Sequence, residues 1–396
     1  MLITAARVLA GPDRHVVADG AVLVREGVLA AVGPREEVER QTQPDEPRLD
    51  FPAGTALPGL IDAHVHLCFD AGADPVSTLQ EQGDEALFAA MAVRARQLLA
   101  VGVTTARDLG DRNGLAVRLA QDIARGSAVG PRVVSATTPI TPPGGHCWFL
   151  GGEVSGPDEV RRLVWGNAES GARVIKVMAT GGGLTKGGAA SWESQFSEEE
   201  LAALVDETHR AGLPVAAHAH GADGITAAVA AGVDTLEHCT WMTADGFEVR
   251  EDVLDQIIEQ NIYVCPTVSP NWRMLPKFFG AERAEAMFDA IRRMAEAGAR
   301  LIAGTDAGVQ RAGFDGLPAA LTFYEHLGLP NDRVLATATT EAACALGLDE
   351  TTGQLTPGYS ADVLVVDGDP LTDLGALRSV ETVLAAGKRY EAGDNA

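Results

Sequence analysis

The segment PGLIDAHVHL, residues 58–67, places His64 and His66 one residue apart at the end of a short apolar run. In a β-strand the side chains at positions i and i+2 point to the same face, so the two imidazoles project side by side. Only nine histidines occur in the chain, and two of them lie here. The segment therefore predicts a strand that presents two donors to a metal ion.

Seven further segments with the same apolar character follow, and amphipathic helical patterns separate them. Helices are indicated by stretches such as residues 84–102, 197–212 and 223–232, which carry apolar residues at three- and four-residue spacing and end in glycine. The eight predicted strands are LIDAHVHL, TTARDLG, RVVSAT, RVIKVMA, PVAAHAH, DTLEHC, IYVCPT and RLIAGTDA. This alternation predicts an α/β fold, a (β/α)8 TIM barrel over residues 57–350. A doubly wound sheet that binds a dinucleotide would show GxGxxG after its first strand, and none is present there.

Both ends of the chain have a different character. Residues 1–56 and 351–396 contain short runs such as GAVLVREGVLAAVG and DVLVVDGDP, in which β-branched residues alternate with glycine, proline and aspartate. Such runs are typical of short strands joined by turns. We expect one small β-sandwich domain that the two termini form together.

Composition limits the partners and the compartment. The formal net charge is −24, and no Lys/Arg-rich run offsets it, which argues against a nucleic-acid partner. The five cysteines are an odd number without CxxC spacing, as in a reducing compartment. No apolar run reaches the ~18 residues of a membrane span. The sequence therefore predicts a cytoplasmic protein that does not act at a membrane.

Residues with metal-binding or titratable side chains cluster where the predicted barrel strands end, which is where TIM barrels place their active sites. They are His64, His66, Lys176, His218, His220, His238 and Asp306. Taken singly, each has an ordinary structural interpretation, such as a buried core histidine or a helix cap. Taken together they predict a metal centre, because burying this many polar side chains at one barrel mouth is costly unless something pairs them.

The segments that carry these residues, such as PGLIDAHVHL, VAAHAHG and GTDAG, resemble those of the amidohydrolase superfamily. They are most similar to its prolidase-like branch of Xaa-Pro dipeptidases and imidazolonepropionase-related enzymes. The resemblance implies two divalent metal ions, zinc being the expected element. His64, His66 and Asp306 would hold one ion, His218 and His238 the other, and Lys176 would bridge both as a carbamate formed with CO2. Only a neutral amine reacts with CO2, so Lys176 requires a lowered pKa. Asp306 would also accept a proton from the attacking water and pass it to the leaving nitrogen.

Two further histidines are expected to take part in catalysis. His220 lies one step beyond His218 on the same face of its strand, and it could contact substrate, support a ligand or bind metal directly. The loop TPPGGHCWFLGG, residues 141–152, carries His146 and resembles the Gly-Gly-His loop of prolidase-like enzymes. There His146 would donate to a substrate carbonyl. The chain departs from that loop at Cys147 and Trp148, which leaves the detailed contact open.

The predicted function is hydrolysis of a C–N amide bond in a small substrate, either a dipeptide of the Xaa-Pro type or an N-acyl amino acid. Alternatives are hydrolysis of a cyclic amide, lactone, carbamate, urea or organophosphate, and a mononuclear deaminase. Deaminases of the superfamily carry an acid shortly after the fifth-strand histidine, whereas His218-Ala219-His220-Gly221 has none. A non-catalytic scaffold would show degenerate ligand positions, and all are filled here. The resemblance also allows assembly into a homo-oligomer.

Overall fold

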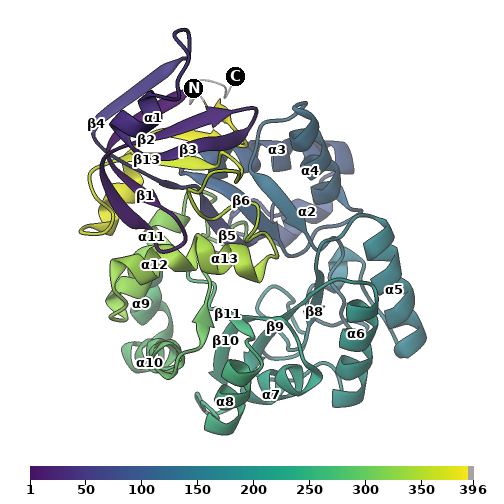
Figure 1. Ribbon diagram of the computed structural model, residues 1–396. Coiled ribbons are helices and arrows are strands. Elements are labelled where there is room, and N and C mark those ends of the chain that lie inside the picture. Colours follow the sequence, from purple (N-terminus) through teal and green to yellow (C-terminus); the bar gives the residue numbers. More distant parts are fainter. Residues whose placement is uncertain (391–396) are drawn as a thin grey trace.

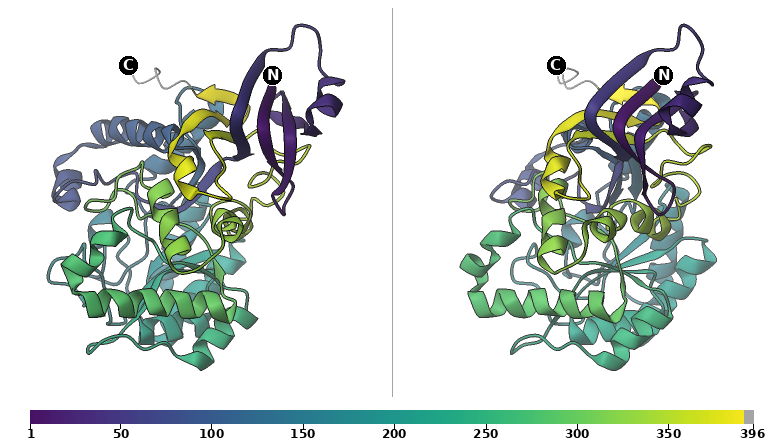
Figure 2. Two further views of the ribbon diagram at one scale, coloured as in Figure 1. Left: turned by 90° about the vertical axis from the view of Figure 1, so that its left-hand side faces the viewer. Right: turned by 60° about the vertical axis from the view of Figure 1, so that its left-hand side comes forward.

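The computed structural model describes residues 1–390, in which strands from both ends of the chain form one sheet. In Figures 1 and 2 the purple N-terminal strands lie side by side with the yellow C-terminal ones. The strand order β15-β14-β13-β4-β1-β2-β3 confirms the predicted terminal β-sandwich. Many of its apolar residues pack in two clusters distinct from the main core of the barrel. Its strands are β1 (Leu2–Ala10), β2 (His15–Arg25), β3 (Val28–Pro34), β4 (Arg48–Pro58), β13 (Val363–Asp367), β14 (Val380–Ala385) and β15 (Lys388–Tyr390).

The predicted barrel is confirmed as eight parallel strands in chain order. They are β5 (Leu60–Val65), β6 (Val103–Asp108), β7 (Arg132–Ser135), β8 (Ile175–Met178), β9 (Val215–Gly221), β10 (Thr235–Met242), β11 (Tyr263–Cys265) and β12 (Arg300–Leu301). Ladders join β5 to β7 and β8 to β12. The ring is closed by the bridge between Ile140 and Val177 on one side and by that between Val65 and Ala307 on the other.

Helix α1 packs against β2 and β3 of the terminal sheet, and the later helices lie around the barrel strands and follow the predicted alternation (Figure 1). Helix α6 begins with a capping box, because Ser197 and Glu200 each accept a hydrogen bond from the other's backbone N–H. The helices are α1 (Arg35–Glu39), α2 (Pro75–Glu81), α3 (Asp84–Ala100), α4 (Leu115–Arg125), α5 (Pro157–Glu169), α6 (Glu198–Arg210), α7 (Ala222–Ala231), α8 (Glu251–Glu259), α9 (Leu275–Phe279), α10 (Ala281–Ala297), α11 (Leu317–His326), α12 (Asn331–Thr337) and α13 (Thr340–Ala345).

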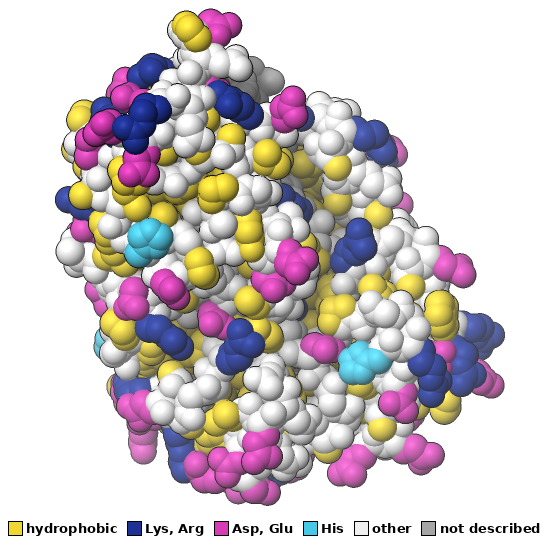
Figure 3. Space-filling model, viewed as in Figure 1, with side chains coloured by type: hydrophobic (Ala, Val, Ile, Leu, Met, Phe, Trp, Pro, Cys, Tyr) yellow, Lys and Arg dark blue, Asp and Glu magenta, His cyan; other side chains and the backbone are white. Residues whose placement is uncertain are grey.

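None of the helices described is both long and apolar enough to cross a bilayer. The five cysteines are unpaired, and only Cys344 is exposed. On the face drawn in Figure 3, acidic and basic side chains are intermingled, and acidic ones gather along the lower edge.

A buried carboxylate joins the terminal sheet to the barrel. Asp362, directly before β13, accepts hydrogen bonds from Arg132 at the start of β7 (2.9 Å), from the Thr352 hydroxyl (2.7 Å) and from the backbone N–H of Ala386 (2.7 Å). Its side chain is almost fully buried. The division of the chain at residues 56 and 351 stays a prediction, and residues 391–396 of the predicted terminal domain lie outside the described residues.

We expect Asp362→Ala to destabilise the protein by about 3–5 kcal/mol, because it leaves a guanidinium and two other donors without their acceptor. The matched control is Glu36→Ala, which breaks the exposed i,i+4 pair between Glu36 and Arg40 and should cost less than about 0.5 kcal/mol. Urea unfolding of both variants measures the difference. Equal shifts of the two midpoints would show that Asp362 does not join the two parts.

Candidate metal centre

The C-terminal end of β5 and the segment that follows β12 bring three donor atoms together. The Nε2 atoms of His64 and His66 lie 3.3 Å apart, and each lies 3.4 Å from Oδ1 of Asp306. Donors placed about 2.0–2.1 Å from a tetrahedral zinc ion are roughly 3.3–3.4 Å from one another. The three atoms therefore have the spacing of one triangular face of a zinc coordination shell.

Hydrogen bonds on the far side of each ring decide which nitrogen faces this triangle. Nδ1 of His64 lies 2.7 Å from Oε2 of Glu237, and Nδ1 of His66 lies 3.3 Å from the carbonyl oxygen of Gly110. Both acceptors favour a proton on Nδ1, which leaves the Nε2 lone pair of each ring directed at the triangle.

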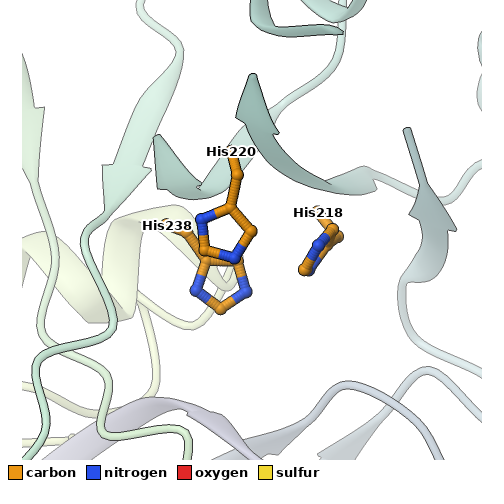
Figure 4. A group of neighbouring side chains, drawn as sticks. All are labelled: His218, His220 and His238. Carbon is orange, nitrogen blue, oxygen red and sulfur yellow. The ribbon is translucent and has the colours of Figure 1, made fainter. Parts of the chain in front are cut away.

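A second group of donors lies beside the first. His218, His220 and His238 come from β9 and β10, and one ring nitrogen from each lies within 4.8 Å of the others. Figure 4 shows the rings of His220 and His238 stacked, with His218 next to them. Their ring centroids are 4.3 Å apart, and that of His218 is 4.6 Å from the His238 ring.

Each ring in this second group also has a fixed orientation. Nε2 of His218 lies 3.0 Å from the carbonyl oxygen of Gly181 and carries the proton, so the free lone pair of this ring is on Nδ1. Nδ1 of His220 pairs with the Thr240 hydroxyl, and Nδ1 of His238 with the Thr267 hydroxyl, which leaves Nε2 free in both.

Backbone strain within β10 and in the segment after β12 orients two of the predicted ligands. His238 and Asp306 have φ angles of 70° and 58°, in the left-handed region that non-glycine residues rarely adopt. The register pairs Glu237 with His218, so Glu237 shares the inward face with that residue. Regular alternation would turn His238 toward the helices, and the left-handed turn instead returns its ring to the site.

Lys176, on β8, is buried, and its Nζ atom has no hydrogen-bond partner among residues 1–390. Burial lowers the pKa of the amine to about 8, against the opposing charge of Glu237, and Arg107 adds to the lowering. A buried amine with a lowered pKa and no partner fits the chemistry of carbamate formation.

Burial also keeps four of these histidines in the neutral form, which is the form that binds metal. It lowers the pKa of His66 and His220 to about 4, and it holds the pKa values of His218 and His238 well below the usual range. For Asp306 burial by itself would raise the pKa of the carboxyl group, but its polar neighbours His64, His66 and Lys176 bring that pKa below the usual value.

His146 reaches the second group from the loop that follows β7. Its ring centroid is 4.6 Å from that of His218, and burial lowers its pKa to about 3. Its backbone N–H donates to the Gln195 side chain (2.7 Å), and its Nδ1 lies 3.3 Å from the Thr185 hydroxyl. The structure thus gathers every predicted site residue at one end of the barrel.

Sequence reasoning missed the residues that hold these side chains. Glu237 directly precedes a predicted ligand, Arg107 lies inside a buried strand, and Gln195 lies in a segment that looks like a solvated loop. The available signal was a charged pair, Arg107 and Glu237, within two strands expected to be buried. Their mutual contact is a property of the closed barrel.

The family model of the amidohydrolase family matches residues 55–390. The chain is 28% identical to ochratoxinase from Aspergillus niger over 94% of this chain and 82% of that protein. It is 27% identical to an imidazolonepropionase from Mesorhizobium japonicum over 89% of this chain and 87% of the relative. A solved structure of a Xaa-Pro dipeptidase with methionine bound in the active site superposes with a TM-score of 0.86 at 28% identity, covering 99% of both chains.

The matched region spans the whole barrel, and the donor geometry is that of a metal site. The chain belongs to the amidohydrolase family and is a metal-dependent hydrolase of carbon–nitrogen bonds.

Proposed function

We propose that the protein holds two divalent cations and hydrolyses the amide bond of a small substrate. Zinc is the expected metal. His64, His66 and Asp306 would hold one ion, His218 and His238 would hold the other, and Lys176, as a carbamate, would be a ligand of both. The observation that carries the proposal is the triangle of donors 3.3–3.4 Å apart, with a second group of free imidazole nitrogens beside it. Bound divalent cations lower the pKa of water and polarise a carbonyl oxygen.

The chain's own residues supply the remaining chemistry. The Asp306 carboxylate is an acceptor at neutral pH and moves a proton from the attacking water to the leaving nitrogen. The His146 ring, steadied on its Nδ1 side by Thr185, donates from Nε2 to the substrate carbonyl. The His220 ring, held through Thr240, contacts the substrate as well.

The substrate class is a dipeptide of the Xaa-Pro type or an N-acyl amino acid. The likeness to the Xaa-Pro dipeptidase over nearly the full length of both chains supports this choice. An imidazolone or another cyclic amide is the second candidate, supported by the match to an imidazolonepropionase.

Metal removal tests the proposal directly. We expect the purified protein to contain about two ions per chain, to lose hydrolysis of a dipeptide and N-acyl amino acid library on chelation, and to regain it with zinc. Elemental analysis measures the metal content, and release of the free amine measures hydrolysis. Ammonia release is followed in parallel. One ion per chain with ammonia from a ring amine would indicate deamination, and activity that survives complete metal removal would refute the proposal.

Lys176→Ala should lose the second ion and lower kcat/KM by about three orders of magnitude, because the shared ligand is gone. Lys388→Ala, an exposed lysine on the terminal sheet, is the control and should keep both ions and full activity. Metal content and kinetics are measured on the same samples. Two ions and normal rates in Lys176→Ala would refute the bridging role.

The roles of His146 and His220 separate in a third experiment. We expect His146→Asn and His220→Asn each to lower kcat/KM by about 10²-fold or more while both metal ions stay bound, because the lost groups act on the substrate. Elemental analysis distinguishes the outcomes. Loss of one ion in His220→Asn would make His220 a direct ligand instead.

A further inference from the structure

A fully buried ion pair lies directly beneath the first group of donors. Glu237, on β10, directs Oε2 at Nδ1 of His64 (2.7 Å) and Oε1 at Nη2 of Arg107 (2.7 Å). The Thr235 hydroxyl donates to the same Oε1 at 2.7 Å. The side chains of Glu237 and Arg107 are 0% and 2% exposed, so water does not compete for these contacts.

All three nitrogen atoms of the Arg107 guanidinium donate hydrogen bonds. Nε donates to the carbonyl oxygen of Ala63 (2.7 Å), Nη1 to the Thr235 hydroxyl (3.1 Å) and Nη2 to Glu237. Ala63 is the residue before His64 on β5. The guanidinium therefore ties the carboxylate on β10 to the backbone that carries the ligand.

The contacts around Glu237 define it as an acceptor. Its Oε1 accepts from the Arg107 guanidinium, with which it forms an ion pair, and from the Thr235 hydroxyl, which itself accepts from Nη1 of Arg107. A carboxylate paired with a guanidinium only accepts hydrogen bonds, so the proton on the His64 ring must lie on Nδ1.

We propose that Glu237, oriented by Arg107, is a positioning residue that fixes the His64 tautomer, so that the Nε2 lone pair faces His66 and Asp306. This inference rests on the metal centre of the proposed function and adds to it two residues that touch neither metal nor substrate. With the proton on Nε2 instead, the ring would direct N–H at the position of the ion.

Stability alone does not separate this role from that of a plain buried ion pair, because removing one member of any such pair is destabilising. Metal affinity does separate them. Partners of ligating histidines typically contribute about 10- to 100-fold to metal affinity, whereas an ion pair that only supports the fold contributes nothing specific to the ion.

Glu237→Gln creates a defined conflict. The single carbonyl oxygen of the amide is required by both Arg107 and His64, and its NH2 group must then face one of two donors. If the NH2 faces His64, the ring has to accept at Nδ1 and carry its proton on Nε2. We expect zinc affinity at the first site to fall about 10- to 100-fold, measured by competition with a chromophoric chelator, and the d–d absorption of the cobalt-loaded protein to change.

Glu207→Gln is the matched control. Glu207 is a nearly buried glutamate on α6 that pairs with Arg161 and Arg210 and lies outside the metal centre. The same change there should leave zinc affinity and the cobalt spectrum as in the wild type.

The double variant Arg107→Met with Glu237→Gln tests the tautomer itself. Without the arginine, the amide oxygen is free to accept from Nδ1 of His64, and its NH2 can donate to the Thr235 hydroxyl. We expect the double variant to bind zinc at least fivefold more tightly than Glu237→Gln alone. If the single variant does not fold by circular dichroism, affinity in the double variant within about tenfold of the wild type supports the proposal, and a larger loss overturns it.

Where the single variant folds, two results would overturn the inference: wild-type zinc affinity in Glu237→Gln, or a double variant no tighter than the single one. These are distinct from failure of the proposed function, in which the wild type itself would bind no zinc.

Discussion

Desolvation of polar side chains at one mouth of the barrel is the constraint on which the rest of the structure depends. Six imidazoles, an amine and a carboxylate meet there, and burial lowers the pKa of most of the histidines into a range where the rings are neutral at physiological pH. Neutral rings keep a lone pair free, and the hydrogen bonds on their far sides determine where that lone pair points. The same burial that is costly for a polar group without a partner thus produces a set of donors for divalent cations.

The scaffold meets this constraint through contacts between strands rather than within them. Carbonyl oxygens of Gly110 and Gly181 and the hydroxyls of Thr240 and Thr267 orient the rings, and left-handed backbone at His238 redirects a side chain that alternation would turn outward. Backbone strain of this kind is stable only where surrounding hydrogen bonds determine it. The barrel therefore supplies a rigid frame, and the loops supply His146 and the approach to the site.

Membership of the amidohydrolase family explains why a metal-dependent hydrolase occupies this barrel, and it leaves specificity to the loops. Relatives as different as an ochratoxinase, an imidazolonepropionase and a Xaa-Pro dipeptidase share the scaffold at 27–28% identity. The loop that carries His146, where Cys147 and Trp148 depart from the familiar pattern, is where substrate preference would differ.

The sequence by itself determined the order of strands and helices and the strand-end donors, because periodicity, helix caps and ligand spacing are encoded within about ten consecutive residues. Only the tertiary structure decided which nitrogen of each histidine is free and which residues hold the rings. Glu237 lies 173 positions from His64 and 130 from Arg107 along the chain, and no local pattern joins residues so far apart. Those contacts exist because the closed barrel brings β5, β6 and β10 around one interior, where a buried charge is costly unless it has a partner.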